Sequence, residues 1–436
     1  MEGEGEEMVG GLMRIKNGQI LRGGEFVDGE LFVDLDTGLF VEPPAGDIDP
    51  NIFQLDASGL LVAPGYIDIQ NNGSFGVDLS LPGLTAADVA RFRRELLQHG
   101  VTSVCPTVVT SDPATYRAVL GLIGGAAGSA EDGACLLGAH LEGPFIDAEK
   151  KGAHKEDFVQ APSAGFQSLL DAYGVDAETL GENVAIVTLA PELDGALDAV
   201  KGLKEQGIQV AFGHTNATLE EAEAAMDVGA TMVTHLFNAM PAFAHREPGV
   251  IGLLGTAAER KGDLYFGIIA DGIHSHSATV KLAYSAHPDG LVLVTDAMPA
   301  MGLPPGEGYA IGEMEVDVMG PEEGKICGRA VLTGTDTLAG SVATMVQCVA
   351  NLREFAQCSA AQAVEAATLR PAQALGIEAH KGVLQPDADA DFVLLDPETL
   401  EPVGTFIAGQ IGWVKDVLKG PYPQIDYDLQ KMGSKL

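Results

Sequence analysis

The sequence predicts an α/β protein: a (β/α)8 TIM-like barrel that carries a small discontinuous β-sandwich domain. The chain has 436 residues, of which 46% are hydrophobic, so it is too long for one small domain and can form a large core. Between residues 61 and 296, apolar runs of strand length alternate with helical stretches, which is typical of repeated β-α units. The segments on either side of this region have the short strands and turns of a β domain.

The first β segment spans residues 11–61, after an acidic tail at 1–10 that we expect to be disordered. Its apolar runs are short, and two dipeptides typical of hairpins, Asn17-Gly18 and Asp28-Gly29, lie among them. Strand character returns over residues 382–436. We expect these C-terminal strands to join the N-terminal ones in one domain.

The barrel is expected over residues 62–381. Its strand candidates lie at 61–70, 101–108, 134–142, 184–189, 208–214, 230–235, 264–270 and 291–296. Its helical stretches lie at 85–99, 112–124, 163–173, 193–206, 218–227, 275–286 and 340–357. A Gly-rich segment at 305–336 follows the last strand, and we expect it to form a small hairpin or lid.

The composition excludes several classes of partner and location. A formal net charge of −37, from 62 acidic and 25 basic residues, makes nucleic acid and anionic membranes poor partners. No apolar stretch reaches the roughly 18 residues of a membrane span, and the acidic N-terminus lacks the positive region of a signal peptide. The five cysteines form no Cys-x-x-Cys pair, which favours free thiols in a reducing compartment. We therefore expect a cytoplasmic protein.

Four of the predicted strands end in a residue that can bind a metal or move a proton: Glu142, His214, His235 and Asp296. Strand ends of a barrel meet at one face, so these side chains are expected to lie together. The glutamate and the two histidines suit a divalent metal, which lowers the pKa of water and polarises a carbonyl. Asp296 could take a proton from water and pass it to a leaving amine. Each residue alone has an ordinary alternative, as a buried core histidine, a strand-end carboxylate or a turn aspartate.

Other polar residues give weaker signals. His140 shares a strand face with Glu142, and we expect it to pack or to support the site. His274 and His276 form a His-x-His after a predicted strand; we expect substrate contact for the first and surface exposure for the second. Arg246 is a loop guanidinium that could bind phosphate in a bidentate pair, although most loop arginines are simply solvated.

Nine segments of the chain resemble, in order, the N-acetylglucosamine-6-phosphate deacetylases, a family of the amidohydrolase superfamily. These segments lie at 64–68, 140–144, 151–154, 213–217, 234–241, 246–249, 270–274, 295–297 and 337–341. The resemblance implies that Glu142, His214 and His235 bind one divalent metal per subunit, with Zn²⁺ expected first and Fe²⁺, Mn²⁺ and Co²⁺ as alternatives. It also implies that Asp296 is the catalytic acid and base, and that His154 helps to stabilise the tetrahedral intermediate.

The resemblance further implies the substrate and its contacts. The implied reaction is hydrolysis of the acetamide of N-acetylglucosamine 6-phosphate to glucosamine 6-phosphate and acetate. Arg246 is implied to reach the phosphate in the neighbouring subunit's site, which implies a homodimer. The implied substrate-binding residues within one subunit are Ala153, His154, Asn238, Ala239 and His274.

One departure and two alternatives complete the prediction. Many amidohydrolases carry a His-x-His for a second metal on the first strand, where this chain has Gln70-Asn71-Asn72; we therefore expect one metal. We assign no substrate contacts within residues 305–333. The alternatives are an amidohydrolase that acts on a cyclic amide or a different N-acetylated sugar, and a non-catalytic relative that binds a sugar phosphate.

Overall fold

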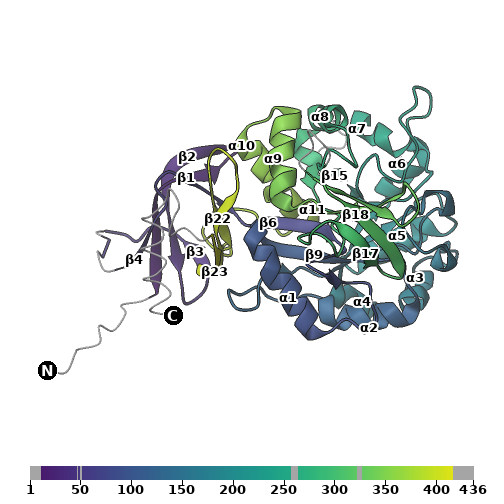
Figure 1. The fold of residues 1–436 in the computed structure, drawn as a ribbon, viewed down its shortest axis with the longest axis horizontal. Coiled ribbons are helices and arrows are strands. Elements are labelled where there is room, and N and C mark those ends of the chain that lie inside the picture. The colour runs from purple at the N-terminus through teal and green to yellow at the C-terminus, as the bar shows by residue number, and fades with distance from the viewer. Residues whose placement is uncertain (1–10, 47, 50–51, 257–263, 322–326, 416–436) are drawn as a thin grey trace.

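The computed structural model describes residues 11–46, 48–49, 52–256, 264–321 and 327–415. The predicted acidic tail and residues 416–436 of the C-terminal segment lie outside these ranges. Figure 1 shows a barrel surrounded by helices, with a small group of strands at one side. The predicted fold class is confirmed, whereas the domain limits at 61/62 and 381/382 stay a prediction.

The strands at the side form one sheet from both ends of the chain, in the order β23-β22-β21-β5-β1-β2-β3 with β4 beside β1. β5 joins the two ends, because it pairs with β1 on one side and with β21 on the other. A separate apolar core stabilises this sheet, and in it Phe392 stacks on Phe406. The strands are β1 (Leu12–Arg22), β2 (Glu25–Asp34), β3 (Leu39–Val41), β4 (Phe53–Asp56), β5 (Leu61–Pro64), β21 (Phe392–Leu395), β22 (Pro402–Ile407) and β23 (Gln410–Val414).

Both predicted hairpin dipeptides were placed wrongly. Asn17-Gly18 lies inside β1, where Asn17 has a φ of 61° and the strand register shifts, so the pair forms a bulge. Asp28-Gly29 lies inside β2. The turn between the two strands is formed by Gly23 and Gly24, with φ values of 58° and 81°. Both the bulge and the turn need left-handed residues, so the dipeptide signal could not separate them.

All eight predicted barrel strands are present and parallel. Their order around the barrel is β6 (Tyr66–Asn71), β9 (Val101–Val109), β11 (Ala139–Glu142), β12 (Val184–Leu189), β13 (Gln209–Phe212), β14 (Met232–Val233), β15 (Tyr265–Ile268) and β16 (Leu291–Leu293). Backbone bonds from Asp296 N to Gln70 O at 2.9 Å and from Asn72 N to Ala297 O at 2.8 Å link the last strand to the first. The barrel is therefore nearly closed, and its closing contacts lie at the carboxyl ends of the strands.

Helices cover the outside of the barrel, and each predicted helical stretch contains one. In α1, Thr85 and Asp88 form a capping box, and Val89, Phe92 and Leu96 form the buried face. The other helices predicted from the sequence are α2 (Pro113–Ile123), α3 (Phe166–Tyr173), α5 (Ala196–Glu205), α6 (Leu219–Asp227), α8 (Ser277–Ala286) and α9 (Met345–Ala356), while α1 spans Ala86–Leu96. The prediction missed α4 (Ala177–Asn183), α7 (Leu253–Thr256), α10 (Ala360–Glu365) and α11 (Leu369–Leu375). None of the helices in the described ranges combines the length and apolar character that a membrane span requires.

The segment after the last barrel strand forms a sheet of its own. Its antiparallel strands are β17 (Gly306–Ile311), β18 (Met314–Met319), β19 (Arg329–Leu332) and β20 (Leu338–Ser341), so the predicted hairpin is confirmed and extended by two strands. The predicted helix at 340–357 starts too early, because β20 occupies its first residues and Thr344 caps α9. β20 also pairs with Ala297, which places this sheet beside the carboxyl ends of the barrel strands.

Candidate metal centre and substrate pocket

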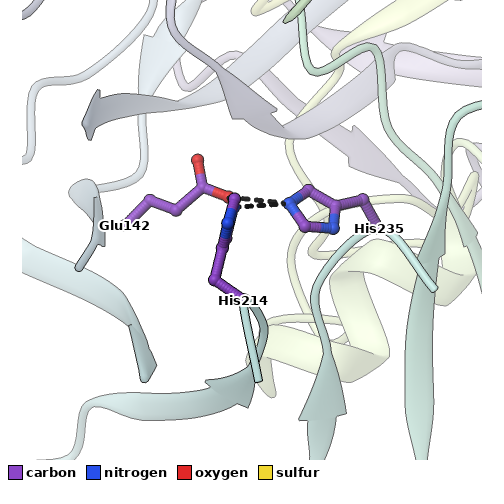
Figure 2. Close-up of side chains that lie close together, drawn as sticks. All are labelled: Glu142, His214 and His235. Carbon is purple, nitrogen blue, oxygen red and sulfur yellow. Dashed lines mark hydrogen bonds and ion pairs between the residues drawn. The ribbon is translucent and has the colours of Figure 1, made fainter. Parts of the chain in front are cut away.

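Glu142, His214 and His235 converge at the carboxyl end of the barrel (Figure 2). His235 Nε2 lies 2.9 Å from Glu142 Oε1 and 3.1 Å from His214 Nε2. His214 Nε2 lies 3.2 Å from the same glutamate oxygen. All three side chains are buried. The structure thus brings together the residues that the sequence analysis proposed as metal ligands.

The donor atoms of this group fit a divalent cation. His214 Nδ1 donates to the carbonyl of Lys150 at 2.8 Å, so in the neutral ring Nε2 carries the lone pair. That lone pair faces a carboxylate oxygen, which is also an acceptor. Two acceptors held face to face in a buried site are stabilised when a cation lies between them. Burial opposes charge on Glu142, but the two histidine rings that face its carboxylate outweigh this and lower its pKa.

Unusual backbone conformations aim these side chains at the barrel mouth. His214, His235 and Asp296 have φ values of 50°, 31° and 46°, in a region that non-glycine residues rarely adopt. Such residues cost about 1–3 kcal/mol each and gather at functional sites. These conformations also take each residue out of its strand, so β13, β14 and β16 end two or three residues before the predicted strand ends.

Asp296 shares a hydrogen-bond network with the metal group. Its Oδ1 accepts from Asn72 Nδ2 at 2.8 Å and from Gln70 Nε2 at 3.3 Å. The same Gln70 nitrogen donates to Glu142 Oε1 at 3.1 Å, so one amide bridges the two carboxylates. Burial, with the charge of Glu142 adding to it, raises the pKa of Asp296 to about 7. A cation held by Glu142 would act in the opposite direction.

A cavity of about 290 Å³ opens above this network and contains every predicted site residue except Arg246. It is lined by Asn72, Val109, Glu142, Glu149, Lys150, Gly152, Ala153, His154, His214, His235, Asn238, Ala239, His274, Asp296, Ile311, Leu338 and Gly340. Ile311 and Leu338 come from the four-stranded sheet and add an apolar wall. Ile311 lies in the segment to which the sequence analysis assigned no contacts, and no motif marks it. Leu338 lies within one of the nine segments.

Two more histidines of the cavity differ in their electrostatics. Burial and the nearby His214 lower the pKa of His154 to about 3, so this ring is neutral. His274 Nδ1 lies 2.6 Å from Asp271 Oδ2. Burial opposes the charged form of His274, but the hydrogen bond and charge of Asp271 outweigh it and raise the pKa of His274. The raised pKa favours the charged form of His274, which suits an anionic group of a ligand, whereas a neutral His154 does not.

The remaining polar candidates lie outside the cavity. Arg246 is exposed on its loop, so within one chain it does not join the site. His276 is exposed and caps α8 through a bond from Ala278 N. His140 is buried below the site, where its ring bonds to Thr188 Oγ1 at 2.7 Å and to Ile69 O at 3.0 Å. Its position agrees with the expected packing role.

A larger cavity, of about 510 Å³, lies between the side sheet and helices α10 and α11. Its described lining is mostly apolar and contains no histidine or cysteine. The smaller cavity, which contains the Glu-His-His group and Asp296, is therefore the candidate active site.

The parallel barrel, with a Glu-His-His group and an aspartate at its strand ends, defines the amidohydrolase class of proteins. Comparison with known proteins gives the same class. The model of the amidohydrolase family matches residues 61–427 of the chain.

Individual relatives narrow the class to one family. The chain is 47% identical to N-acetylglucosamine-6-phosphate deacetylase of Danio rerio, over 83% of this chain and 87% of that protein. It is 43% identical to the Homo sapiens protein of the same name, over 96% of this chain and 100% of that protein. The Mycobacterium smegmatis deacetylase, solved as a point mutant in complex with N-acetyl-D-glucosamine 6-phosphate, is 31% identical and superposes with a TM-score of 0.76, over 92% of this chain and 98% of that one. The chain belongs to the N-acetylglucosamine-6-phosphate deacetylase family of the amidohydrolases.

Proposed function

We propose that this chain hydrolyses the acetamide of N-acetyl-D-glucosamine 6-phosphate to D-glucosamine 6-phosphate and acetate. The observation that carries the proposal is one cavity that holds a buried Glu-His-His group, a strand-end aspartate and a histidine paired with the carboxylate of Asp271. These groups match the needs of the reaction: a water to activate, a proton to move and a phosphate to bind. Membership of the family supports the same substrate.

Glu142, His214 and His235 would hold one divalent cation per subunit. Zn²⁺ is our first choice, and Fe²⁺, Mn²⁺ and Co²⁺ suit the same donors. When bound, the cation lowers the pKa of water and polarises the acetyl carbonyl. Gln70 and Asn72 occupy the position of a second-metal His-x-His, and their amide nitrogens already donate to carboxylates, which favours a single metal.

Asp296 moves the proton. Both hydrogen bonds that it accepts from the described side chains go to Oδ1, which leaves Oδ2 to take the proton of the attacking water. The water oxygen bonds to the acetyl carbon, and the neutral His154 would donate a hydrogen bond to the carbonyl oxygen as negative charge develops there. Asp296 then gives its proton to the nitrogen as the carbon–nitrogen bond breaks.

The phosphate would be bound by other residues that line the same cavity. These residues are Asn238, Ala239 and His274, whose charged form the nearby Asp271 carboxylate favours. Arg246 would come from a second copy of the chain in a homodimer. Two features support this arrangement: Arg246 is exposed outside its own chain's cavity, and the neighbouring Phe243 is 62% exposed on the same loop.

We also propose a cytoplasmic location for this enzyme. All five cysteines are free thiols, and two sugar phosphates as substrate and product are typical of intracellular metabolism. The acidic composition gives no support to nucleic acid or an anionic membrane as a partner.

The test is acetate release from N-acetylglucosamine 6-phosphate beside the unphosphorylated sugar, with bound metal measured in the same sample. Strong preference for the phosphate, with about one metal per chain, is expected. Equal turnover of the unphosphorylated sugar would favour another N-acetylated sugar or a cyclic amide as the substrate. Binding without turnover in a metal-loaded sample would instead indicate a non-catalytic sugar-phosphate binder.

A further inference from the structure

A residue without an assigned role, Thr110, contacts the buried ring of His154. Thr110 directly follows β9, and its peptide nitrogen lies 3.2 Å from His154 Nδ1. Its hydroxyl oxygen lies 2.8 Å from the same ring atom. Both residues are almost fully buried, at 4% and 5% exposure, so water does not compete for these bonds. Two groups of one residue therefore meet one nitrogen of the ring.

The peptide N–H of Thr110 decides which nitrogen of the His154 ring carries the proton. A peptide N–H can only donate, so His154 Nδ1 must be the acceptor and cannot carry a proton. This excludes the tautomer with the proton on Nδ1, and it excludes the doubly protonated ring. The proton of the neutral ring is therefore on Nε2.

The neighbouring histidine has the opposite arrangement. His214 Nδ1 faces a carbonyl, that of Lys150, at 2.8 Å, so its proton is on Nδ1 and its Nε2 has the lone pair. The ring centroids of His154 and His214 lie 4.4 Å apart in the same cavity. One backbone carbonyl and one backbone N–H thus give two adjacent histidines different forms, one suited to bind a cation and the other to donate a hydrogen bond.

We propose that the peptide N–H and hydroxyl of Thr110 together fix His154 as the Nε2–H tautomer, which makes Thr110 a positioning residue for deacetylation. His154 Nε2 lies 4.0 Å from Glu142 Oε2, beyond hydrogen-bond distance, so its proton is available to a substrate oxygen. In this form His154 acts as a donor, and it is neither a metal ligand nor a base. The catalytic consequence rests on the proposed function, whereas the tautomer does not.

A purely structural role for Thr110 is the competing explanation. Its hydroxyl also lies 3.4 Å from the carbonyl oxygen of Glu142, and it has a single proton. In the competing explanation that proton goes to the carbonyl and links the ends of β9 and β11, instead of going to His154. Loss of that link would disturb the metal group and the fold. The tests must therefore report on the tautomer and on metal content separately.

The first test is nitrogen NMR of the Zn²⁺-loaded full chain with ¹⁵N-labelled histidine. The His154 signals are assigned as those that disappear in the spectrum of the His154→Gln variant. The expected spectrum has a protonated Nε2 and an unprotonated Nδ1. A proton on Nδ1, or on both nitrogens, would overturn the proposal. No substrate is present, so the result does not depend on the deacetylase activity, which the acetate assay of the wild-type protein tests by itself.

The second test compares two replacements of His154. The amide nitrogen of glutamine reaches the position of Nε2 and can still donate, whereas that of asparagine reaches only the position of Nδ1. We expect His154→Asn to lower kcat by about 10²–10³-fold, and His154→Gln to keep about tenfold more activity than His154→Asn, with bound metal unchanged in both. Equal losses would overturn the donor role.

The third test concerns Thr110 directly. Thr110→Val removes the hydroxyl and preserves the shape, and we expect kcat to fall about two- to tenfold with KM and bound metal unchanged. The Nδ1 signal of His154 should move as well, because one of its two donors is lost. Thr110→Ser, which keeps the hydroxyl, should restore both readouts. A Thr110→Val protein with wild-type kcat and an unmoved Nδ1 signal would overturn the role of Thr110.

Discussion

Asn72 donates a hydrogen bond from Nδ2 to Oδ1 of Asp296 at 2.8 Å. Asn72 directly follows β6 and Asp296 follows β16, the first and last strands of the barrel. The bond therefore joins the two edges of the barrel at the point where the reaction would take place. It also holds one oxygen of the carboxylate that we propose as the base, so the contact connects barrel closure with the proposed proton transfer.

Replacing Asn72 by aspartate tests this contact. Asn72→Asp keeps the shape but sets a second carboxylate against Asp296, and two carboxylates at this distance cannot both ionise. The pKa of Asp296 as the base rises further, so the acidic limb of the kcat/KM pH profile should move to higher pH. Asn72→Ala, which adds no charge, serves as the control and should leave the limb closer to that of the wild type. An unmoved limb in Asn72→Asp, with unchanged bound metal, would show that the contact does not influence the base.

Asp296→Asn removes the proposed base without changing the shape of the site. We expect a loss of about 10²–10⁴-fold in kcat, because an amide can neither take the proton of water nor give one to the leaving amine. Bound metal should stay at the wild-type level, since Asp296 is not part of the Glu-His-His group. Acetate release and metal content on one preparation check this prediction. Near-normal turnover would remove Asp296 as the base.

The four strand-end residues could be predicted because a parallel barrel brings the ends of distant strands to one face. Glu142, His214, His235 and Asp296 each follow an apolar run that is visible in the sequence. The start of the helix predicted at 340–357 was placed too early, because the apolar pattern does not separate this helix from the strand before it. The apolar pattern continues through Gly340, and only the pairing of β20 with its neighbours shows that this part is a strand.

Other site residues could not be predicted, because their roles depend on contacts between distant segments. Thr110 and His154 are 44 residues apart, and a threonine after a strand has no local signal for a histidine partner. Ile311 looks like any apolar residue of an antiparallel strand until the sheet lies beside the barrel mouth. The amide at Gln70 was predicted only as a missing metal ligand, whereas the structure shows that it bridges Glu142 and Asp296.

Removal of the metal should abolish activity and lower stability together. A cation bound only by the folded chain adds stability, so dialysis against a chelator should lower the thermal unfolding midpoint and stop acetate release. Added Zn²⁺ should restore both. His235→Ala should imitate the chelator, whereas His276→Asn, at an exposed helix cap where asparagine is well tolerated, should change neither readout. Full activity after complete removal of metal would contradict the proposed centre.

His99 should make the protein sensitive to moderate acid. Burial lowers the pKa of His99 to about 4, and its ring stacks on Phe75 at 5.7 Å. As the pH falls from about 6.5 towards 4, the unfolded chain binds a proton at His99 and the folded chain does not, so the free energy of unfolding falls. The loss is at most about 3 kcal/mol and stops below the folded pKa. Unfolding free energies across this range should fall less steeply for His99→Gln than for the wild type. Identical slopes would contradict the prediction.

The proposed homodimer predicts that Arg246 acts across the subunit boundary. Arg246→Ala alone should raise KM for the phosphorylated substrate by about 10–100-fold, the value of a charge-assisted hydrogen bond, and should leave the bound metal unchanged. A mixture of Arg246→Ala and Asp296→Asn chains then shows whether Arg246 serves the partner's site or the site of its own chain. If each site combines Asp296 of one chain with Arg246 of the other, every mixed dimer has one intact site. Random pairing makes half of the dimers mixed, so unfolding and refolding the chains together should restore about a quarter of wild-type activity at low substrate. If Arg246 serves its own chain, no mixed dimer contains an intact site, and the mixture will stay as weak as its parents.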